Sequence, residues 1–180
     1  YYNHVDKLDD TQAEIQSVLK DVDFDRAEYW GNTTHKVSDT TFSTNILDDY
    51  KMVNLKNQIY KNVLLYVRDL NGSTTMEFKI NSCWFAKNDK NEYTRIHNHG
   101  HSDISGVYYY QTNQNDGDIT FLCPYANFST MIYSDLKDTV SYKPEVGKIL
   151  LFPGWLYHTV SENNTAETRI SISFNIDFER

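Results

Sequence analysis

The sequence lacks the many cysteines of disulfide-rich proteins and the long apolar runs of membrane-spanning proteins. It contains only two cysteines, Cys83 and Cys123, and both lie in strand-like runs beside large apolar residues. We therefore expect buried free thiols rather than a disulfide framework, and a protein that works in a reducing compartment. No apolar run approaches the roughly 18–20 residues of a membrane-spanning helix, so no membrane span is expected.

Positive charge is also scarce. The chain has 17 Lys and Arg against 25 Asp and Glu, which gives a formal net charge of −8. The cationic residues are scattered and form no basic stripe, although such clustering supplies most of the affinity of proteins that bind nucleic acids. A nucleic-acid partner is therefore not expected, and a peptide or a small cationic molecule would suit the charge better.

The first 72 residues have the periodicity of helices. Thr11 and Glu14 have the spacing of a capping box, in which a hydroxyl and a carboxylate satisfy free amides at the start of a helix. A second helix is predicted to begin near Asn45, with apolar residues at spacings of three, four and seven. Asn71 and Gly72 are expected to end it.

After Gly72 the apolar period changes to two, which predicts strands. They are expected at residues 76–85, 104–111, 118–122, 128–134, 139–142, 148–152, 156–160 and 169–178. Many short strands separated by Gly, Asn, Asp and Pro are typical of a sandwich or barrel. Because the sequence has no repeat, linker or low-complexity tract, we expect one domain over residues 1–180. It should be mainly β, a barrel or jelly roll with the N-terminal helices packed on one outer face.

The predicted strand at 169–178 is amphipathic. Its isoleucine and phenylalanine residues share one face, and polar residues from Arg169 to Asp177 share the other. In an ordinary sandwich the polar face would meet solvent. In a barrel that holds a ligand, the apolar face would pack on the helices and the polar face would line a wet interior. The sequence leaves both arrangements open.

Three of the six histidines fall within residues 97–103, which read HNHGHSD. On a strand, His97 and His99 would project from the same side about 6–7 Å apart, a spacing that one metal ion can bridge. The third ligand is expected to be His158, because a strand, a Pro-Gly turn and a second strand would bring it opposite the first pair. Imidazole and carboxylate ligands are the set expected for non-haem Fe(II). The alternative is a polar turn without a metal.

Several motifs occur in an order that resembles a known family. They are HNHGHSDISGVYYY, PEVGKILLFPGWLYHTV and ETRISISFN, within about residues 80–176. They are similar to the 2-oxoglutarate/Fe(II)-dependent oxygenase family of phages and bacteria, with its pattern of His-x-His, Ser-Gly-Val-Tyr-Tyr, Phe-Pro-x-Trp-Leu-x-His and Arg-Ile-Ser-x-Ser-Phe-Asn. The resemblance implies a double-stranded β-helix at residues 73–180, an Fe(II) cofactor and 2-oxoglutarate as co-substrate.

A second ligand set is present in the same segment. His101 and Asp103 fit the His-x-Asp pattern that oxygenases of the wider superfamily use. However, Asp103 runs almost directly into the next predicted strand and leaves no room for a turn. His97, His99 and His158 are therefore the preferred metal ligands, and Asp103 is kept as an additional acid ligand by analogy with the cupin metal site.

The distal carboxylate of 2-oxoglutarate needs a cation. Arg169, on the polar face of the last strand, can bind a carboxylate through two parallel hydrogen bonds, and Ser171 on the same face can add a third. The resemblance assigns this role to Arg169 and Ser171, and implies that Tyr109 points inward and donates to 2-oxoglutarate. The alternatives are a surface ion pair for Arg169 and a packing role for Tyr109.

Three functions fit these residues. The resemblance favours an Fe(II)- and 2-oxoglutarate-dependent dioxygenase that uses molecular oxygen to hydroxylate a C–H bond of a small-molecule or peptide substrate, with release of succinate and CO2. A cupin-type dioxygenase or isomerase that does not use 2-oxoglutarate is the second, and a non-catalytic binding barrel is the third. The Asn- and Lys-rich composition and the resemblance also lead us to expect a virus-encoded protein that acts in its host's cytoplasm.

Overall fold

The computed structural model describes residues 1–26, 34–41, 43–124 and 138–179. The helices are α1 (Leu8–Val18), the 3-10 helix η1 (Leu19–Asp21), α2 (Ile46–Asp49) and α3 (Val53–Asp69). The strands are β1 (Tyr2–His4), β2 (Asp25–Arg26), β3 (Lys36–Val37), β4 (Phe78–Asn88), β5 (Thr94–His97), β6 (Ile104–Gln111), β7 (Ile119–Leu122), β8 (Thr139–Tyr142), β9 (Lys148–Pro153), β10 (His158–Val160) and β11 (Arg169–Phe178).

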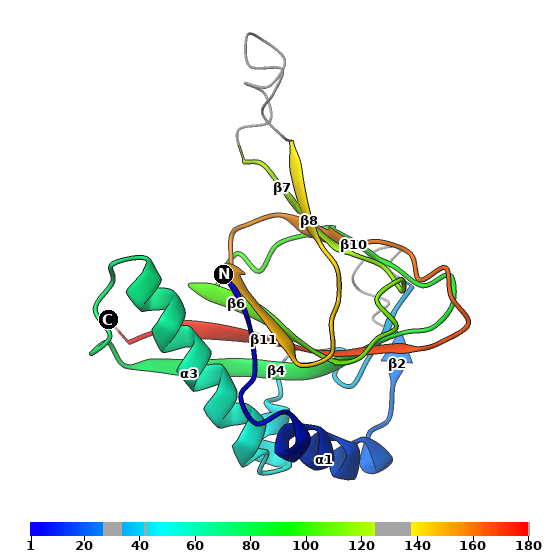
Figure 1. Cartoon of the computed structure of the whole chain (residues 1–180), viewed down its shortest axis with the longest axis horizontal. Helices are drawn as coiled ribbons and strands as arrows, with labels where there is room; N and C mark the ends of the chain where they lie inside the picture. Colours follow the sequence, from blue (N-terminus) through cyan, green and yellow to red (C-terminus); the bar gives the residue numbers. More distant parts are fainter. Residues whose placement is uncertain (27–33, 42, 125–137, 180) are drawn as a thin grey trace, which may run out of the picture.

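The strands form two antiparallel sheets. The larger has the order β1-β9-β6-β11-β4-β3-β2, and the smaller has the order β5-β10-β7-β8. From β4 onward the chain crosses from one sheet to the other at every connection except that between β7 and β8. This alternation is that of a double-stranded β-helix, and it confirms the predicted mainly β jelly roll. Helices α1 and α3 cover the side of the larger sheet that faces away from the smaller one (Figure 1).

The alternation of apolar and polar residues correctly predicted most of the strands in the second half of the chain. The strands predicted at 104–111, 139–142 and 169–178 match β6, β8 and β11. The strand predicted at 128–134 lies outside the described residues. Strands β1, β2, β3 and β5 were not predicted; the first three have only two or three residues, too few to show a period. Pairing with longer neighbours holds them, as when β1 joins β9 and β3 joins β4.

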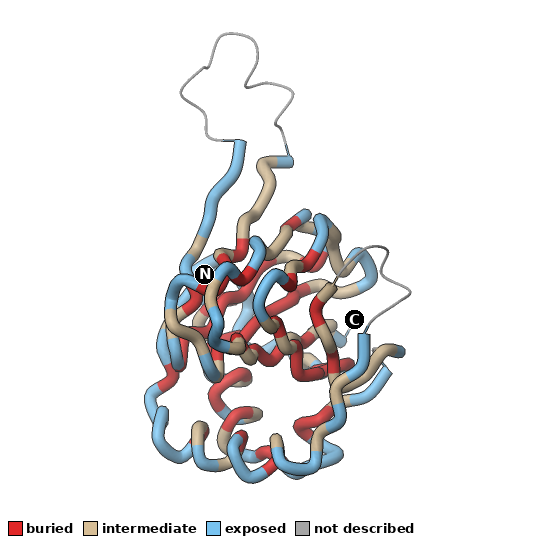
Figure 2. The backbone as a smooth tube through the Cα atoms, turned by 90° about the vertical axis from the view of Figure 1, so that its right-hand side faces the viewer, coloured by how far each residue is buried: buried red, intermediate tan, exposed pale blue. Residues whose placement is uncertain are grey.

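The two faces of β11 lie in different environments. Its apolar face packs on the helices, where Ile172 and Phe174 share a fully buried cluster with Ile59 of α3. Its polar face points between the two sheets, where Arg169 and Ser171 are buried. The buried segments of the chain gather in the interior of the molecule (Figure 2). Of the two arrangements that the sequence left open, the barrel with a polar interior is therefore the one present.

The predicted capping box is wrong. Helix α1 already begins at Leu8, so Thr11 lies inside it and is fully buried. The Glu14 carboxylate does not cap its own helix; it accepts hydrogen bonds of 2.9 Å from the backbone amides of Asn54 and Leu55 at the start of α3. The positive end of the α3 dipole favours a carboxylate there, so Glu14 ties the two helices together.

The second predicted helix starts and ends where expected but is interrupted. The Asn45 side chain caps α2 by accepting a hydrogen bond of 3.1 Å from the Leu47 amide. Lys51 then has a φ of 54°, a left-handed conformation that separates α2 from α3. At the far end, the Gly72 amide donates to the Val67 carbonyl at 2.8 Å and terminates α3.

The two cysteines and Gly106 can also be located in the structure. Cys83 is buried and Cys123 is half-buried, and both are free thiols. Gly106 allows β6 to approach the core closely, because a Cβ there would overlap the Phe174 ring.

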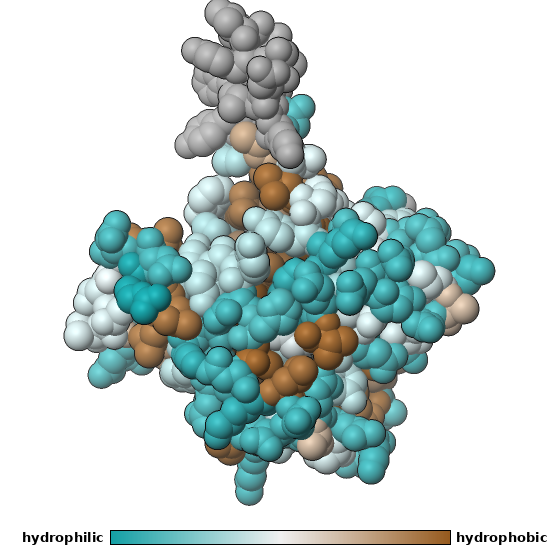
Figure 3. Space-filling model, viewed as in Figure 1, coloured by the Kyte–Doolittle hydropathy of each residue, from teal (hydrophilic) through white to brown (hydrophobic). Residues whose placement is uncertain are grey.

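The outer surface agrees with the polar composition. The face shown in Figure 3 is largely hydrophilic, with apolar residues in limited patches. Within the described ranges, no helix is both long enough and apolar enough to cross a bilayer.

Candidate active site

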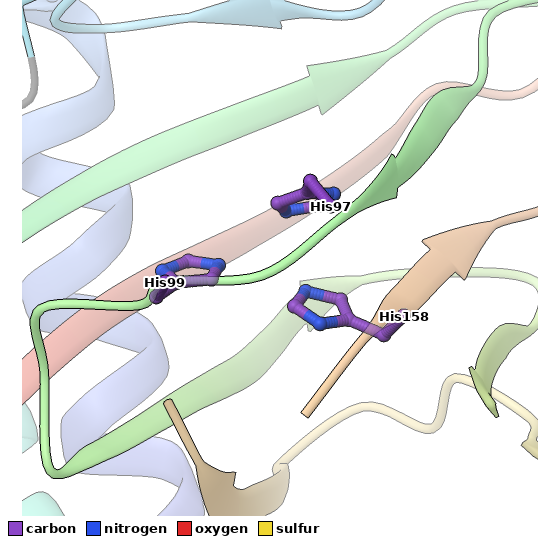
Figure 4. A group of neighbouring side chains, drawn as sticks. All are labelled: His97, His99 and His158. Carbon is purple, nitrogen blue, oxygen red and sulfur yellow. The ribbon is translucent and has the colours of Figure 1, made fainter. Parts of the chain in front are cut away.

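Three histidines converge between the sheets. His97 ends β5 and His158 begins β10, and the two are direct partners in the antiparallel register. His99 lies two residues beyond β5, in the turn that leads to β6. Ligand nitrogens of the three side chains all lie within 4.8 Å of one another. Their ring centroids are 4.2 to 5.3 Å apart, and the rings surround a common space (Figure 4).

The turn between β9 and β10 fixes the position of His99. The His99 amide donates to the Gly154 carbonyl at 2.7 Å, and the Gly154 amide donates to the Asp103 carbonyl at 3.2 Å. A Cβ on Gly154 would overlap the Ser102 carbonyl oxygen, so only glycine allows this approach. The Pro-Gly pair of the sequence therefore does more than reverse the chain, since it holds His99 beside His158.

Backbone carbonyls fix the tautomers of two of the histidines. Nδ1 of His97 lies 2.7 Å from the Arg95 carbonyl oxygen, and Nδ1 of His158 lies 3.0 Å from that of Leu156. Because a carbonyl can only accept, each Nδ1 must carry the proton. The lone pair of each neutral ring is then on Nε2, the nitrogen available to a metal.

A side-chain amide does the same for His99. Nδ1 of His99 lies 2.7 Å from Oδ1 of Asn175, which also accepts from the Ser105 hydroxyl at 2.9 Å. The Asn175 amide nitrogen donates to the Ser82 hydroxyl at 3.1 Å, so the amide orientation is set by both of its ends. Trp84 stacks on the His99 ring with centroids 6.0 Å apart. All three histidines thus have defined orientations and their lone pairs on Nε2.

Burial keeps these imidazoles neutral. Burial, together with a smaller effect of the neighbouring His97, lowers the pKa of His99 to about 4 and that of His158 to about 3. The pKa of His97 is lowered as well, again mainly by burial. Metal ions bind neutral imidazole, so the site is ready for a metal at neutral pH without losing protons.

We expect acid to destabilise the metal-free protein. Burial lowers the pKa of His35 to about 4 and that of His158 to about 3, below the ordinary value of 6.5. Between pH 6.5 and 4 the unfolded chain therefore binds more protons than the folded chain, and the free energy of unfolding decreases as the pH falls. At pH 5.5 each histidine accounts for a loss of about 1.4 kcal/mol relative to neutral pH. Urea unfolding at pH 7.5 and 5.5 measures this loss, and His35→Gln should reduce it. Equal stability at the two pH values would show that these rings are not buried in the folded state.

The alternative ligands lie outside the histidine group. The Asp103 carboxylate accepts a hydrogen bond of 3.0 Å from the Phe178 amide, and the Asp103 amide donates to the Asp177 carboxylate at 3.1 Å. Asp103 thus joins the start of β6 to the end of β11. His101 is exposed. Among the described residues, the cluster able to hold a metal comprises the three histidines alone.

A pocket between the sheets connects these histidines with Arg169. Ser171 and Tyr109 also line it, so the three residues predicted to bind 2-oxoglutarate face the same space as the histidines. In the sheet, Ser171 of β11 is the direct partner of Tyr109 of β6. Burial raises the pKa of Tyr109 well above its usual value, which keeps its hydroxyl protonated.

Arg169 is buried and held on one side only. Its Nη1 donates to the carbonyl oxygens of Asp116 and Gly117 at 3.0 and 2.7 Å. Gly117 has a φ of 105°, and a Cβ there would overlap the Ser161 carbonyl oxygen, so glycine is required in this turn. In the described part of the chain, Nε of Arg169 has no hydrogen-bond partner and no carboxylate forms a salt bridge with the guanidinium.

Two residues that line the pocket, His35 and Asn88, were not assigned to the site in the sequence analysis. His35 lies directly before β3, and its Nδ1 is 3.2 Å from the Thr94 hydroxyl. It has no ligand spacing to a second histidine, so only the pairing of β3 with β4 brings it here. Asn88, at the end of β4, lines the pocket beside Arg169. The alternation of β4 could have identified it, since Trp84 and Ala86 on the same face also line the pocket.

Comparison with known proteins places the chain in a family. A family model described as "Putative 2OG-Fe(II) oxygenase" matches residues 82–175, more than half of the 180 residues. The chain belongs to this family. It is an enzyme of the 2OG-Fe(II) oxygenase type, with iron as cofactor and 2-oxoglutarate as co-substrate. A search of curated proteins gave no match.

Solved structures share the fold of this 2OG-Fe(II) oxygenase. The alpha-ketoglutarate-dependent epimerase SnoN from nogalamycin biosynthesis is 14% identical, with a TM-score of 0.66 over 97% of this chain and 76% of SnoN. HygX from Streptomyces hygroscopicus, solved with nickel and 2-oxoglutarate, is 9% identical, with a TM-score of 0.59 over 93% and 78%. A prolyl-4-hydroxylase from Pseudomonas putida is 15% identical, with a TM-score of 0.59 over 100% and 91%. At these identities the likeness establishes the double-stranded β-helix.

Proposed function

We propose that this 2OG-Fe(II) oxygenase binds its iron through Nε2 of His97, His99 and His158. The observation that carries the proposal is that three neutral imidazoles with fixed tautomers direct their lone pairs into one space. Imidazole suits iron, and three protein ligands would leave positions open for further molecules. The third imidazole takes the place of the carboxylate in the usual set of two histidines and one acid.

We propose further that Arg169 anchors the distal carboxylate of 2-oxoglutarate. Two carbonyls occupy Nη1, so the opposite edge of the guanidinium, formed by Nε and Nη2, is left for a bidentate carboxylate. Ser171 and Tyr109 supply hydroxyl groups on the same pocket wall. A dicarboxylate that bridges Arg169 and the histidines would satisfy the buried Nε.

The residues of the chain orient the co-substrate and exclude water from the site. When bound, iron and 2-oxoglutarate activate molecular oxygen and yield succinate and CO2 as by-products of hydroxylation. Arg169 at one end of the pocket and the histidines at the other fix both ends of the co-substrate. Trp84 stacks on His99, and Phe152 lies with its ring centroid 4.8 Å from that of His158, so apolar side chains exclude water around the ligands.

Turnover of 2-oxoglutarate tests this function. We expect the purified protein, given Fe(II), 2-oxoglutarate and oxygen, to form succinate even without a substrate, and to develop a visible absorption band when 2-oxoglutarate is added without oxygen. A protein that binds iron but gives neither signal would be a cupin-type metalloprotein. A protein that binds no metal would be a non-catalytic barrel.

Removing the partner of His99 should weaken the metal site without destroying it. In Asn175→Ala the imidazole loses the acceptor that fixes its tautomer and orientation. We expect the Fe(II) affinity to fall by about 10- to 100-fold. Asn81→Ala is the matched control, since Asn81 lies on the adjacent strand and pairs with Asp177 on the exposed side. Chelator competition measures both affinities, and an equal loss in the two variants would contradict a specific role for Asn175.

The substrate is proposed to be a small molecule or a peptide, hydroxylated at a C–H bond. The acidic composition disfavours a nucleic acid. Among the proteins of similar fold, HygX has been solved with hygromycin B bound, and SnoN with nogalamycin RO. An origin in a virus and action in the host cytoplasm remain predictions from composition and resemblance.

A further inference from the structure

Unpartnered buried donors are concentrated in the pocket. In the described part of the chain, three buried side-chain atoms have no hydrogen-bond partner: Thr11 Oγ1, Asn88 Nδ2 and Arg169 Nε. Leaving such a group unsatisfied is costly, so each one calls for an explanation. Two of the three, on Asn88 and Arg169, line the same pocket.

These two donors lie side by side. Asn88 of β4 is the direct partner of Arg169 in β11, and the two residues are 1% and 2% exposed. Both side chains face the space between the sheets. They lie farther along the pocket wall than His99, because Trp84, which stacks on His99, lies four residues earlier on β4.

The position of Asn88 is fixed from outside the pocket. Its backbone carbonyl accepts a hydrogen bond of 3.0 Å from the Asn163 side chain, which is itself fully buried. The next residue, Asp89, accepts from the Thr168 hydroxyl at 2.6 Å. The end of β4 is therefore anchored to the loop before β11, and Asn88 can present its amide to a ligand without a change of backbone.

We propose that the Asn88 amide is a second donor to the carboxylate bound by Arg169. An amide and a guanidinium next to each other, both buried and both with a free N–H, form a site for one carboxylate group. Asn88 then helps the enzyme to select a dicarboxylic 2-oxo acid over a monocarboxylic one. This inference rests on the proposed role of Arg169 in binding 2-oxoglutarate.

Calorimetric titration of the Fe(II)-loaded protein without oxygen tests the assignment. We expect Asn88→Ala to weaken 2-oxoglutarate binding by about 10- to 100-fold, because a hydrogen bond to a charged group is lost. Asn88→Asp should weaken it further, since the new carboxylate would itself occupy Arg169. Binding of 2-oxopentanoate, which has the same length but no distal carboxylate, should be equal in the wild type and in Asn88→Ala.

Thermal unfolding separates this role from a structural one. The Asn88 amide nitrogen has no partner in the described structure, so Asn88→Ala should not lower the midpoint of the ligand-free protein, but it should reduce the increase caused by 2-oxoglutarate. Thr11→Ala is the control, because it removes the third unpartnered atom, in α1, and should leave 2-oxoglutarate binding unchanged.

The two proposals can fail separately. If the wild type binds 2-oxoglutarate and Asn88→Ala binds it within twofold of the same affinity, the assignment of Asn88 is wrong while that of Arg169 stands. A wild type that does not bind 2-oxoglutarate would overturn both.

Discussion

Replacing His158 with alanine is expected to abolish iron binding and, with it, the formation of succinate from 2-oxoglutarate. His158 is 4% exposed and lies directly opposite His97, and among the described residues the group able to hold a metal has no fourth member. Two imidazoles remain. We expect the Fe(II) affinity to fall by more than about 100-fold, a larger loss than that expected when only the hydrogen-bond partner of a ligand is removed. The metal content after gel filtration and chelator competition measure this loss. His158→Gln, which keeps much of the volume, should give the same result.

His101→Ala is the control for this prediction. His101 is an exposed histidine two residues after His99, and in the described structure it lies outside the group that can hold a metal. The variant should therefore retain iron and activity. Loss of iron in His101→Ala, with retention in His158→Ala, would instead support the ligand pair His101 and Asp103.

Replacing Arg169 with lysine is expected to weaken 2-oxoglutarate binding by about 100-fold and to leave iron binding within about threefold of the wild type. Lysine keeps the charge but loses the planar fork that binds a carboxylate through two hydrogen bonds. It can still donate toward the carbonyls of Asp116 and Gly117, which Arg169 Nη1 now satisfies. Separate titrations with Fe(II) and with 2-oxoglutarate measure the two affinities.

Arg95→Lys is the matched change outside the pocket. The Arg95 side chain is exposed, and the Arg95 backbone carbonyl that lies 2.7 Å from His97 Nδ1 is kept in the variant. Both affinities should therefore be retained. If Arg169→Lys lowers the iron and 2-oxoglutarate affinities equally, or neither of them, Arg169 is not the anchor of the co-substrate.

The parts of the fold that could be predicted from the sequence are those with a regular period. The alternation of Ile and Phe with polar residues defined β11 and separated its helix-facing side from its pocket-facing side. The capping box failed because α1 begins at Leu8, which leaves Thr11 inside the helix, and because Glu14 accepts from another helix. Glu14 accepts a hydrogen bond at the start of α3 from a residue 40 positions away, and the spacing of neighbouring residues cannot predict such a contact.

The same limit applies to the site. His97 and His99 are close in the sequence, and His158 could be placed because a strand, a turn and a strand have few geometries. His35 could not be assigned in this way, since it reaches the pocket through the pairing of β3 with β4, whereas the alternation of β4 places Asn88 on the pocket face without showing that it lies beside Arg169. The orienting role of Asn175 likewise depends on where the β11 face meets the turn that carries His99.

A crystal structure of the protein with Fe(II) and an inert analogue of 2-oxoglutarate would test the central claim most directly. We predict one ion bound by Nε2 of His97, His99 and His158, with the distal carboxylate of the analogue on the Nε and Nη2 edge of Arg169. An ion held by His101 or Asp103, or an analogue bound away from Arg169, would contradict this account.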